Sequence, residues 1–154
     1  LCKKIKANML EVFRKLHDEK EVRRFYVGGA LGVDMWAAEQ ILRLKEQPGY
    51  EDIELVVALP FVGHDAKWDQ RSKRRMEFIL QHCSKKEVIG NEDCRESYIK
   101  RNCYMVDQAN YLVAVYDDVR NLRSGTMQCV RYARKNDVPV VLIHPDTANI
   151  TYPM

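Results

Sequence analysis

The stretch RRFYVGGALGVDMWAAEQ, residues 23–40, contains the sharpest change of pattern in the chain. A short apolar run ends at Gly28 and Gly29, and Gly32 and Asp34 follow before an amphipathic helical pattern begins. Glycines at the end of a strand let the backbone approach a ligand and adopt dihedral angles that other residues avoid. The helix that follows directs free N–H groups and the positive end of its dipole at the same place. The stretch therefore predicts a strand, an anion-binding loop and a helix, with phosphate as the usual anion.

The loop also allows a second interpretation, a tight turn between strand and helix that holds no ligand. Its pattern is G-G-x-x-G, so it meets neither the dinucleotide pattern G-x-G-x-x-G nor the phosphate-loop pattern that ends in G-K-[ST]. The role of Asp34 also allows two interpretations. A carboxylate in the first helical turn favours the helix dipole, and it can also accept a hydrogen bond from a ligand hydroxyl or from the neighbouring loop.

Helical and strand patterns alternate on either side of this stretch. Strands are predicted over 24–27, 53–59, 87–89, 111–116 and 138–143, and helices over 3–19, 33–45, 66–83, 96–109 and 126–135. Runs such as IELVVAL are apolar throughout, which is typical of strands buried on both faces. We therefore expect an α/β fold with a single doubly wound, mainly parallel sheet and helices on both faces, in one domain over residues 1–154. Such a domain normally opens with a strand, so the first strand is expected before Leu1.

The composition limits the classes of function. The chain has 154 residues, is 46% hydrophobic and 31% charged, and carries a net charge of +3, as is ordinary for a globular protein. No apolar run approaches the length of a membrane span. Its five cysteines form no C-x-x-C pair, so we predict a reduced, cytoplasmic protein without disulfides, and no metal or cofactor. The basic run over residues 71–75 is most simply a solvated helix face.

A second loop repeats the arrangement of the first. Ser124, Gly125 and Thr126 open the helix after the strand YLVAVY, although a serine there can simply cap the helix. Arg101 precedes that strand, and arginine suits bidentate recognition of phosphate, although a lone arginine is more often a surface charge. The sequence shows no complete catalytic set. The predicted ligand-binding residues are Gly28, Gly29, Gly32, Asp34, Arg101, Ser124, Gly125 and Thr126.

These motifs carry a family resemblance. The run YVGGALGVDMWAAE, a strand ending LPF, a helix containing KWDQ, and the late SGT resemble the YpsA-like proteins. They belong to the SLOG superfamily of Rossmann-like domains, named for the Smf/DprA and Lonely Guy proteins. The resemblance covers Arg24 to Pro145. It implies a small phosphate-containing ligand, a nucleotide or nucleotide derivative, held between the two glycine loops. Its relatives are often dimers, so it also implies a homo-oligomer.

The Lonely Guy branch implies an alternative function, hydrolysis of the N-glycosidic bond of a nucleoside monophosphate. Its pattern M-H-x-R-K-x-x-M is matched loosely by YIKRNCYM, which places the catalytic arginine of that branch on Arg101. The pattern P-G-G-x-G-T-x-x-E is matched by RSGTMQC, with its glutamate position on Cys129. An oxocarbenium-like transition state needs a carboxylate nearby, so Asp34, Glu39 or Asp117 would have to supply it.

The DprA branch implies a third function, association with single-stranded DNA through the basic residues 71–75. The loop at Asp34 also resembles the G-x-x-x-G-[IV]-D loop of that branch. The superfamily further tends to carry a T-G-x-R stretch on its first strand, and this sequence contains none. If such a strand lies before Leu1, part of the ligand site lies with it.

Overall fold

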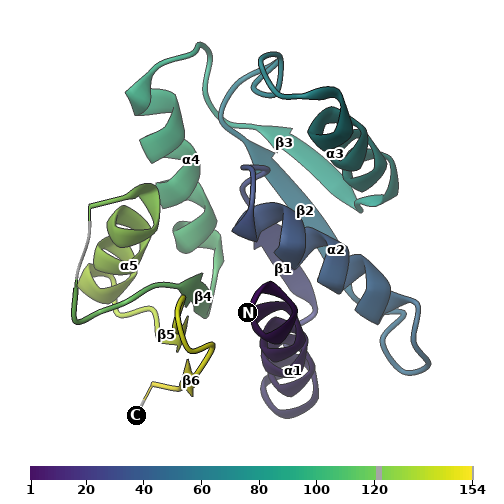
Figure 1. Ribbon diagram of the computed structural model, residues 1–154, viewed down its shortest axis with the longest axis vertical. Coiled ribbons are helices and arrows are strands. Elements are labelled where there is room, and N and C mark those ends of the chain that lie inside the picture. Colours follow the sequence, from purple (N-terminus) through teal and green to yellow (C-terminus); the bar gives the residue numbers. More distant parts are fainter. Residues whose placement is uncertain (121–122, 154) are drawn as a thin grey trace.

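The computed structural model describes residues 1–120 and 123–153 (Figure 1). Five helices are present among these residues: α1 (Cys2–Lys20), α2 (Val33–Lys45), α3 (Gln70–His82), α4 (Arg95–Gln108) and α5 (Gly125–Lys135). The strands are β1 (Arg24–Val27), β2 (Glu54–Leu59), β3 (Lys85–Val88), β4 (Leu112–Val115), β5 (Val140–Ile143) and β6 (Ile150–Thr151).

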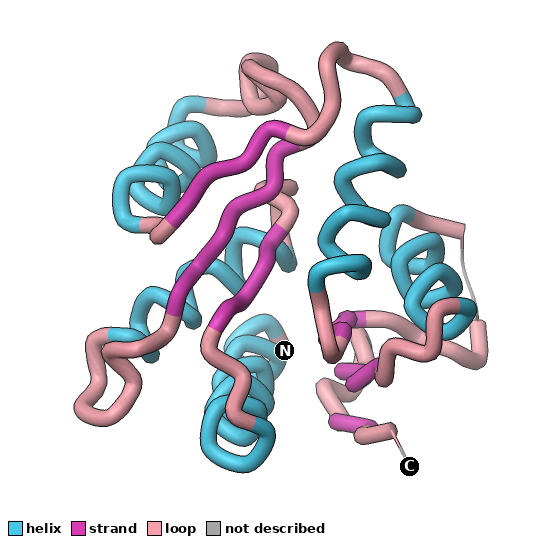
Figure 2. Tube along the Cα trace, turned by 180° about the vertical axis from the view of Figure 1, so that it is seen from behind, coloured by secondary structure: helices cyan, strands magenta, loops and turns pink. Residues whose placement is uncertain are grey.

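The strands form two three-stranded sheets, with the orders β1-β2-β3 and β4-β5-β6. The first sheet is parallel throughout, and in the second β4 and β5 are parallel while β6 is antiparallel to β5. The two sheets lie side by side (Figure 2). The α/β, Rossmann-like class predicted from the sequence is confirmed. The single sheet expected from the sequence is divided into two, because the facing edges of β1 and β4 pair with no strand among the described residues.

Strand β2 shows why this chain forms a layered structure. Five of its six residues are buried, so both of its faces are covered. Leu55, Val57 and Leu59 belong to the main hydrophobic core, which also contains Ile41 of α2 and Met76 of α3. Because side chains alternate along a strand, the remaining buried residues of β2 face the opposite side of the sheet, as the continuous apolar run predicted.

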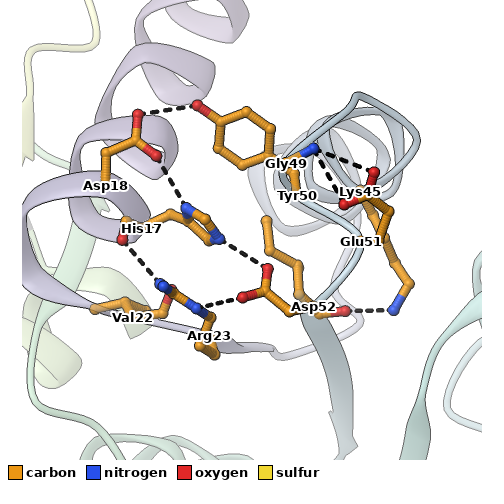
Figure 3. A network of polar contacts seen from close by, with 10 residues as sticks. His17, Asp18, Val22, Arg23, Lys45, Gly49, Tyr50, Glu51 and Asp52 are labelled. Carbon is orange, nitrogen blue, oxygen red and sulfur yellow. Dashed lines mark hydrogen bonds and ion pairs between the residues drawn. The ribbon is translucent and has the colours of Figure 1, made fainter.

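Helix α1 is fixed to the first sheet at its carboxyl end by a polar cluster around His17 (Figure 3). The buried ring of His17 has Asp18 Oδ1 2.9 Å from its Nδ1 and Asp52 Oδ1 2.9 Å from its Nε2. Arg23 Nε lies 2.5 Å from Asp52 Oδ2, and the Tyr50 hydroxyl donates a hydrogen bond of 2.9 Å to Asp18. The cluster joins the end of α1 to the loop that leads into β2.

Two details of the predicted elements were wrong. The helix predicted over 66–83 begins at Gln70, because the Asp69 side chain accepts a hydrogen bond of 2.8 Å from the Ser72 amide and caps the helix there. The sequence KWDQ, residues 67–70, therefore leads into α3, and only its last residue, Gln70, is helical. Strand β6 was not predicted, because two residues are too short for a periodic signal. None of the described helices is long and apolar enough to cross a membrane.

Candidate functional site

A cavity of about 930 Å³ lies between the two sheets. Its walls include the lengths of β1 and β4, the inner face of α1 and part of α4, and it reaches the loop after β1 and the start of α5. Five of the eight predicted ligand-binding residues line it: Gly28, Asp34, Arg101, Gly125 and Thr126. The carboxyl ends of parallel strands are the usual ligand position in open α/β sheets.

Arg101 is the central side chain at this end of the cavity. It is only 5% exposed, although it lies on α4, far from the glycine loop in sequence. Its Nη1 donates a hydrogen bond to the carbonyl oxygen of Gly28, and its Nε donates one of 2.8 Å to Asn102 Oδ1. Burial lowers the pKa of the Arg101 guanidinium, and the nearby Asp34 carboxylate opposes that effect. The arginine therefore joins α4 to the end of β1 and brings a buried positive charge to the cavity.

Asp34 lies in the first turn of α2, on the other side of Gly28. A Cβ atom on Gly28 would lie 2.7 Å from Asp34 Oδ2 and 2.9 Å from Arg101 Nη1, so a larger residue here would displace one of these two side chains. The Ala30 amide donates a hydrogen bond of 3.3 Å to Asp34 Oδ2. Burial raises the pKa of the Asp34 carboxyl, whereas Arg101 and the loop amides act to lower it. The carboxylate is therefore shared between the glycine loop and the buried arginine.

The second predicted loop forms the start of α5. Ser124 is the N-cap, and its Oγ accepts a hydrogen bond of 3.1 Å from the Met127 amide. The simple capping interpretation therefore accounts for the Ser124 hydroxyl. The first residues of an α-helix have no intrahelical acceptor for their N–H groups. Gly125 and Thr126 are the first two residues of α5, so they present two such amides at the cavity wall.

Gly29 and Gly32 lie outside the cavity lining. Gly29 has a φ of 69°, its carbonyl oxygen lies 2.8 Å from His64 Nε2, and a Cβ there would meet the Leu59 side chain at 2.7 Å. Gly32 is the N-cap of α2 with a φ of 81°, a conformation that favours glycine. Both glycines therefore have structural reasons to be glycine: one allows close packing against β2, and the other shapes the turn into α2.

Sequence reasoning missed the role of Asn102. Its Oδ1 accepts from Arg101, and its Nδ2 donates a hydrogen bond of 3.2 Å to Gln128 Oε1 on α5. Asn102 therefore links the buried arginine to the helix that carries the second loop. An amide beside an arginine in a helical pattern was the available signal, but periodicity alone does not show that both residues face inward.

Cys129 lines the same cavity as Asp34 and Arg101. Burial raises the pKa of the Cys129 thiol to about 12, and the nearby Asp34 carboxylate adds to that effect. The thiol is therefore protonated at neutral pH and cannot replace a glutamate as a base. Of the three carboxylates considered as replacements, Asp34 alone lines the cavity. Glu39 pairs with Arg75 at 2.5 Å, and Asp117 pairs with Arg120 at 2.7 Å.

One group of side chains has atoms that could bind a metal ion within 4.8 Å of one another: Asp117, His144 and Asp146. Arg120 already pairs with both carboxylates, at 2.7 Å to Asp117 and 2.6 Å to Asp146. This hydrogen-bonded arginine lowers the pKa of Asp117 to about 2. The guanidinium supplies the positive charge that these carboxylates require, so the cluster is explained as an ion-pair network.

The basic run over residues 71–75 lies on α3, outside the cavity lining. Arg75 is bound to Glu39 of α2, with hydrogen bonds of 3.2 and 2.5 Å, while Arg71 and Arg74 are exposed. This arrangement agrees with the solvated helix face expected from the sequence.

Comparisons with known proteins identify the family. The sequence profile of the YspA SLOG family matches residues 1–148. The chain belongs to this family. It is similar to the uncharacterized SPbeta prophage-derived protein YoqJ of Bacillus subtilis, with 34% identity over an alignment 166 positions long that covers 97% of this chain and 94% of that protein.

Two UPF0398 proteins are also similar to part of the chain. One from Staphylococcus epidermidis is 28% identical over 94 residues, and one from Bacillus cereus is 29% identical over 94 residues. Each match covers 60% of this chain, and it spans 49% of the first protein and 50% of the second. The chain thus spans about half the length of these UPF0398 relatives.

Proposed function

We propose that the chain binds a nucleotide or a nucleotide derivative, and that it holds the phosphate between the end of β1 and the start of α5. The observation that carries this proposal is the buried Arg101 at the cavity wall, beside Gly28. A buried guanidinium next to free helix N-terminal amides suits an anion, because both provide donors and positive potential.

The parts of the site have different roles in this proposal. The amides of Gly125 and Thr126 donate to the phosphate, and the α5 dipole adds to the attraction. Arg101 contributes positive charge from the neighbouring helix α4. Asp34 holds the glycine loop through the Ala30 amide, and its carboxylate limits the positive charge of the site when no ligand is bound. The remaining volume of the cavity accommodates the nucleoside part of the ligand.

A charge change at Gly125 tests the proposal. The position is helical, has an ordinary φ, and has no atom closer than 3.9 Å to a Cβ placed there, so a side chain fits. Gly125→Asp places a carboxylate where the phosphate is expected, and Gly125→Asn places an uncharged side chain of the same shape there. Calorimetric titration with AMP, ADP, ATP and adenosine compares both variants with the unaltered chain.

The expected result is that AMP or a larger nucleotide binds more tightly than adenosine. Gly125→Asp should weaken that binding by at least about tenfold, which corresponds to about 1.4 kcal/mol, and by clearly more than Gly125→Asn does. Equal affinity for AMP and adenosine would show that phosphate is not recognised. Failure of every nucleotide to bind would overturn the proposal.

A second candidate function rests on Asp34. Its buried carboxyl shares the cavity with Arg101 and Cys129, and its pKa is raised by burial. A carboxyl in this state suits general acid–base work on an N-glycosidic bond. Incubation of the chain with AMP, followed by chromatography, would reveal released adenine, and Asp34→Asn should abolish the release. Binding of AMP without release would exclude this activity and leave the binding function intact.

A further inference from the structure

Two carbonyl oxygens of the glycine loop contact side chains that are distant in the sequence. Arg101 Nη1 on α4 donates a hydrogen bond to the Gly28 carbonyl, and His64 Nε2, in the loop between β2 and α3, lies 2.8 Å from the Gly29 carbonyl oxygen. A carbonyl oxygen only accepts, so Nε2 of His64 carries the hydrogen of this contact. Arg101 lines the cavity, whereas His64 does not.

The peptide unit between Gly29 and Ala30 is held from both sides. In a trans peptide the C=O and the following N–H point in opposite directions, and no cis peptide occurs in the described residues. The Gly29 carbonyl meets His64, and the Ala30 amide donates a hydrogen bond of 3.3 Å to Asp34 Oδ2. Ala30 and Asp34 line the cavity, whereas Gly29 and His64 do not. The contact with His64 therefore keeps the Gly29 carbonyl on the side away from the cavity.

This orientation leaves the loop with unused donors, while the carbonyls of Gly28 and Gly29 are both engaged. The amides of Gly29, Leu31 and Gly32 have no hydrogen-bond acceptor among the described residues. Successive backbone amides without acceptors attract an anion, and a carbonyl oxygen directed at the same place would oppose it. The orientation of one peptide unit thus decides whether the loop suits a phosphate.

Glycine makes the opposite orientation accessible. Gly29 has a φ of 69°, and a glycine passes between this conformation and others at little steric cost. Rotation of the Gly29–Ala30 peptide unit would direct its carbonyl at the cavity and its amide at His64. The His64 ring is itself packed against Trp68, with ring centroids 5.2 Å apart and planes at 77°, and Trp68 packs against the main core. A side chain fixed in this way opposes the rotation.

We propose that His64 is a positioning residue of the phosphate site, whose Nε2–H holds the Gly29 carbonyl away from the cavity so that the glycine loop offers amide donors to the ligand. His64 acts through the loop and does not touch the ligand. Its effect on affinity rests on the proposed function, because it requires a phosphate beside Gly28. Its hold on the loop can be measured without any ligand.

Three variants test this role by calorimetric titration with AMP. His64→Leu removes the donor, and His64→Gln keeps an N–H at a similar reach. Val62→Ala, in the same loop at a side chain that is 83% exposed, is the control. His64→Leu should weaken AMP binding by about three- to tenfold, the range expected for the loss of one hydrogen bond. His64→Gln should restore the affinity to within about twofold, and Val62→Ala should leave it unchanged. Unchanged affinity in His64→Leu, or an equal loss in His64→Leu and His64→Gln, would overturn the proposal.

Hydrogen exchange without ligand separates this role from the proposed function. The Ala30 amide, which donates to Asp34, should exchange at least about threefold faster in His64→Leu than in the unaltered chain or in His64→Gln. The Glu54 amide, which donates to the Arg23 carbonyl between β1 and β2, should exchange at the same rate in all of them. Equal acceleration at Ala30 and Glu54 would indicate a general loss of stability and overturn the positioning role. If AMP fails to bind the unaltered chain, the proposed function fails. Faster exchange confined to Ala30 would then still support the hold of His64 on the loop, and unchanged exchange would overturn it.

Discussion

The guanidinium of Arg101 donates a hydrogen bond to the carbonyl oxygen of Gly28, across 73 positions of sequence. The contact fixes α4, which precedes the second sheet, against the end of β1 in the first sheet. Since the arginine is buried, the hydrogen bond also keeps a positive charge beside the glycine loop. The fold and the proposed ligand site therefore depend on the same side chain.

Replacing Arg101 by methionine should destabilise the chain and remove phosphate binding. The change leaves the Gly28 carbonyl and the Asp34 carboxyl without their cationic neighbour, so the free energy of unfolding should fall by about 2–4 kcal/mol. Urea denaturation measures this loss. Lys100→Met, on the exposed side of the same helix, is the matched control and should change stability by no more than about 0.5 kcal/mol. An equal effect of the two changes would contradict the structural role of Arg101.

The His17 cluster predicts a loss of stability in acid. Hydrogen bonding to His17 lowers the pKa of Asp18 and of Asp52 from the ordinary value of 3.8. The folded chain therefore binds fewer protons than the unfolded chain. The stabilisation is fully present above that ordinary pKa and is lost as the pH falls through the lowered pKa values.

Asp52→Asn should remove part of this pH dependence. Thermal unfolding followed between about pH 5 and pH 2 should show a smaller decline for the variant than for the unaltered chain. Glu46→Gln, which changes a carboxyl at the end of α2 outside the cluster, is the control and should preserve the original decline. Parallel curves for Asp52→Asn and the unaltered chain would refute the contribution of the cluster.

Gly90 provides a test of packing alone. A Cβ atom there would collide with the backbone carbonyl of Pro60 and would lie 2.6 Å from the Ser97 Cβ, and neither neighbour can rotate away. Gly90→Ala should therefore lower the free energy of unfolding by about 1–3 kcal/mol. Gly125→Ala is the control, since its Cβ meets no atom closer than 3.9 Å. Similar denaturation midpoints for the two variants would be inconsistent with this packing.

The cysteines should differ in reactivity. Cys2 is exposed, whereas Cys129 is half-buried and burial raises its pKa to about 12. Because the thiolate is the reactive form, iodoacetamide at about pH 8 should modify Cys2 well before Cys129. Mass spectrometry of digested protein, with and without urea, measures the order. Modification of Cys129 at the rate of Cys2 in the folded chain would show that the cavity wall is open.

The sequence predicted the fold well where its signals were local. The apolar run of β2 was sufficient to predict a buried parallel strand, and that strand is present. The glycines after β1 were sufficient to predict a strand followed by a loop and a helix, and this arrangement is also present. The start of α3 was missed because the helical pattern continues upstream of its cap at Asp69, and the cap decides where the helix begins.

The candidate site was harder to predict, because its parts meet through contacts distant in sequence. The pattern indicated Gly28, Arg101 and Gly125, and the structure brings these three residues to one cavity. Local sequence could not separate a glycine that faces a cavity from one that allows close packing, as Gly29 does, or shapes a turn, as Gly32 does. Asn102 was missed for a related reason, since its role depends on a partner that lies on another helix.

Helix α1 is attached at both ends, through Asn8 to the loop after β5 and through His17 to the loop before β2. These two loops belong to different sheets, so α1 connects the two sheets. The separation of the sheets is then governed by side-chain contacts, which adjust more readily than a continuous ladder of backbone hydrogen bonds.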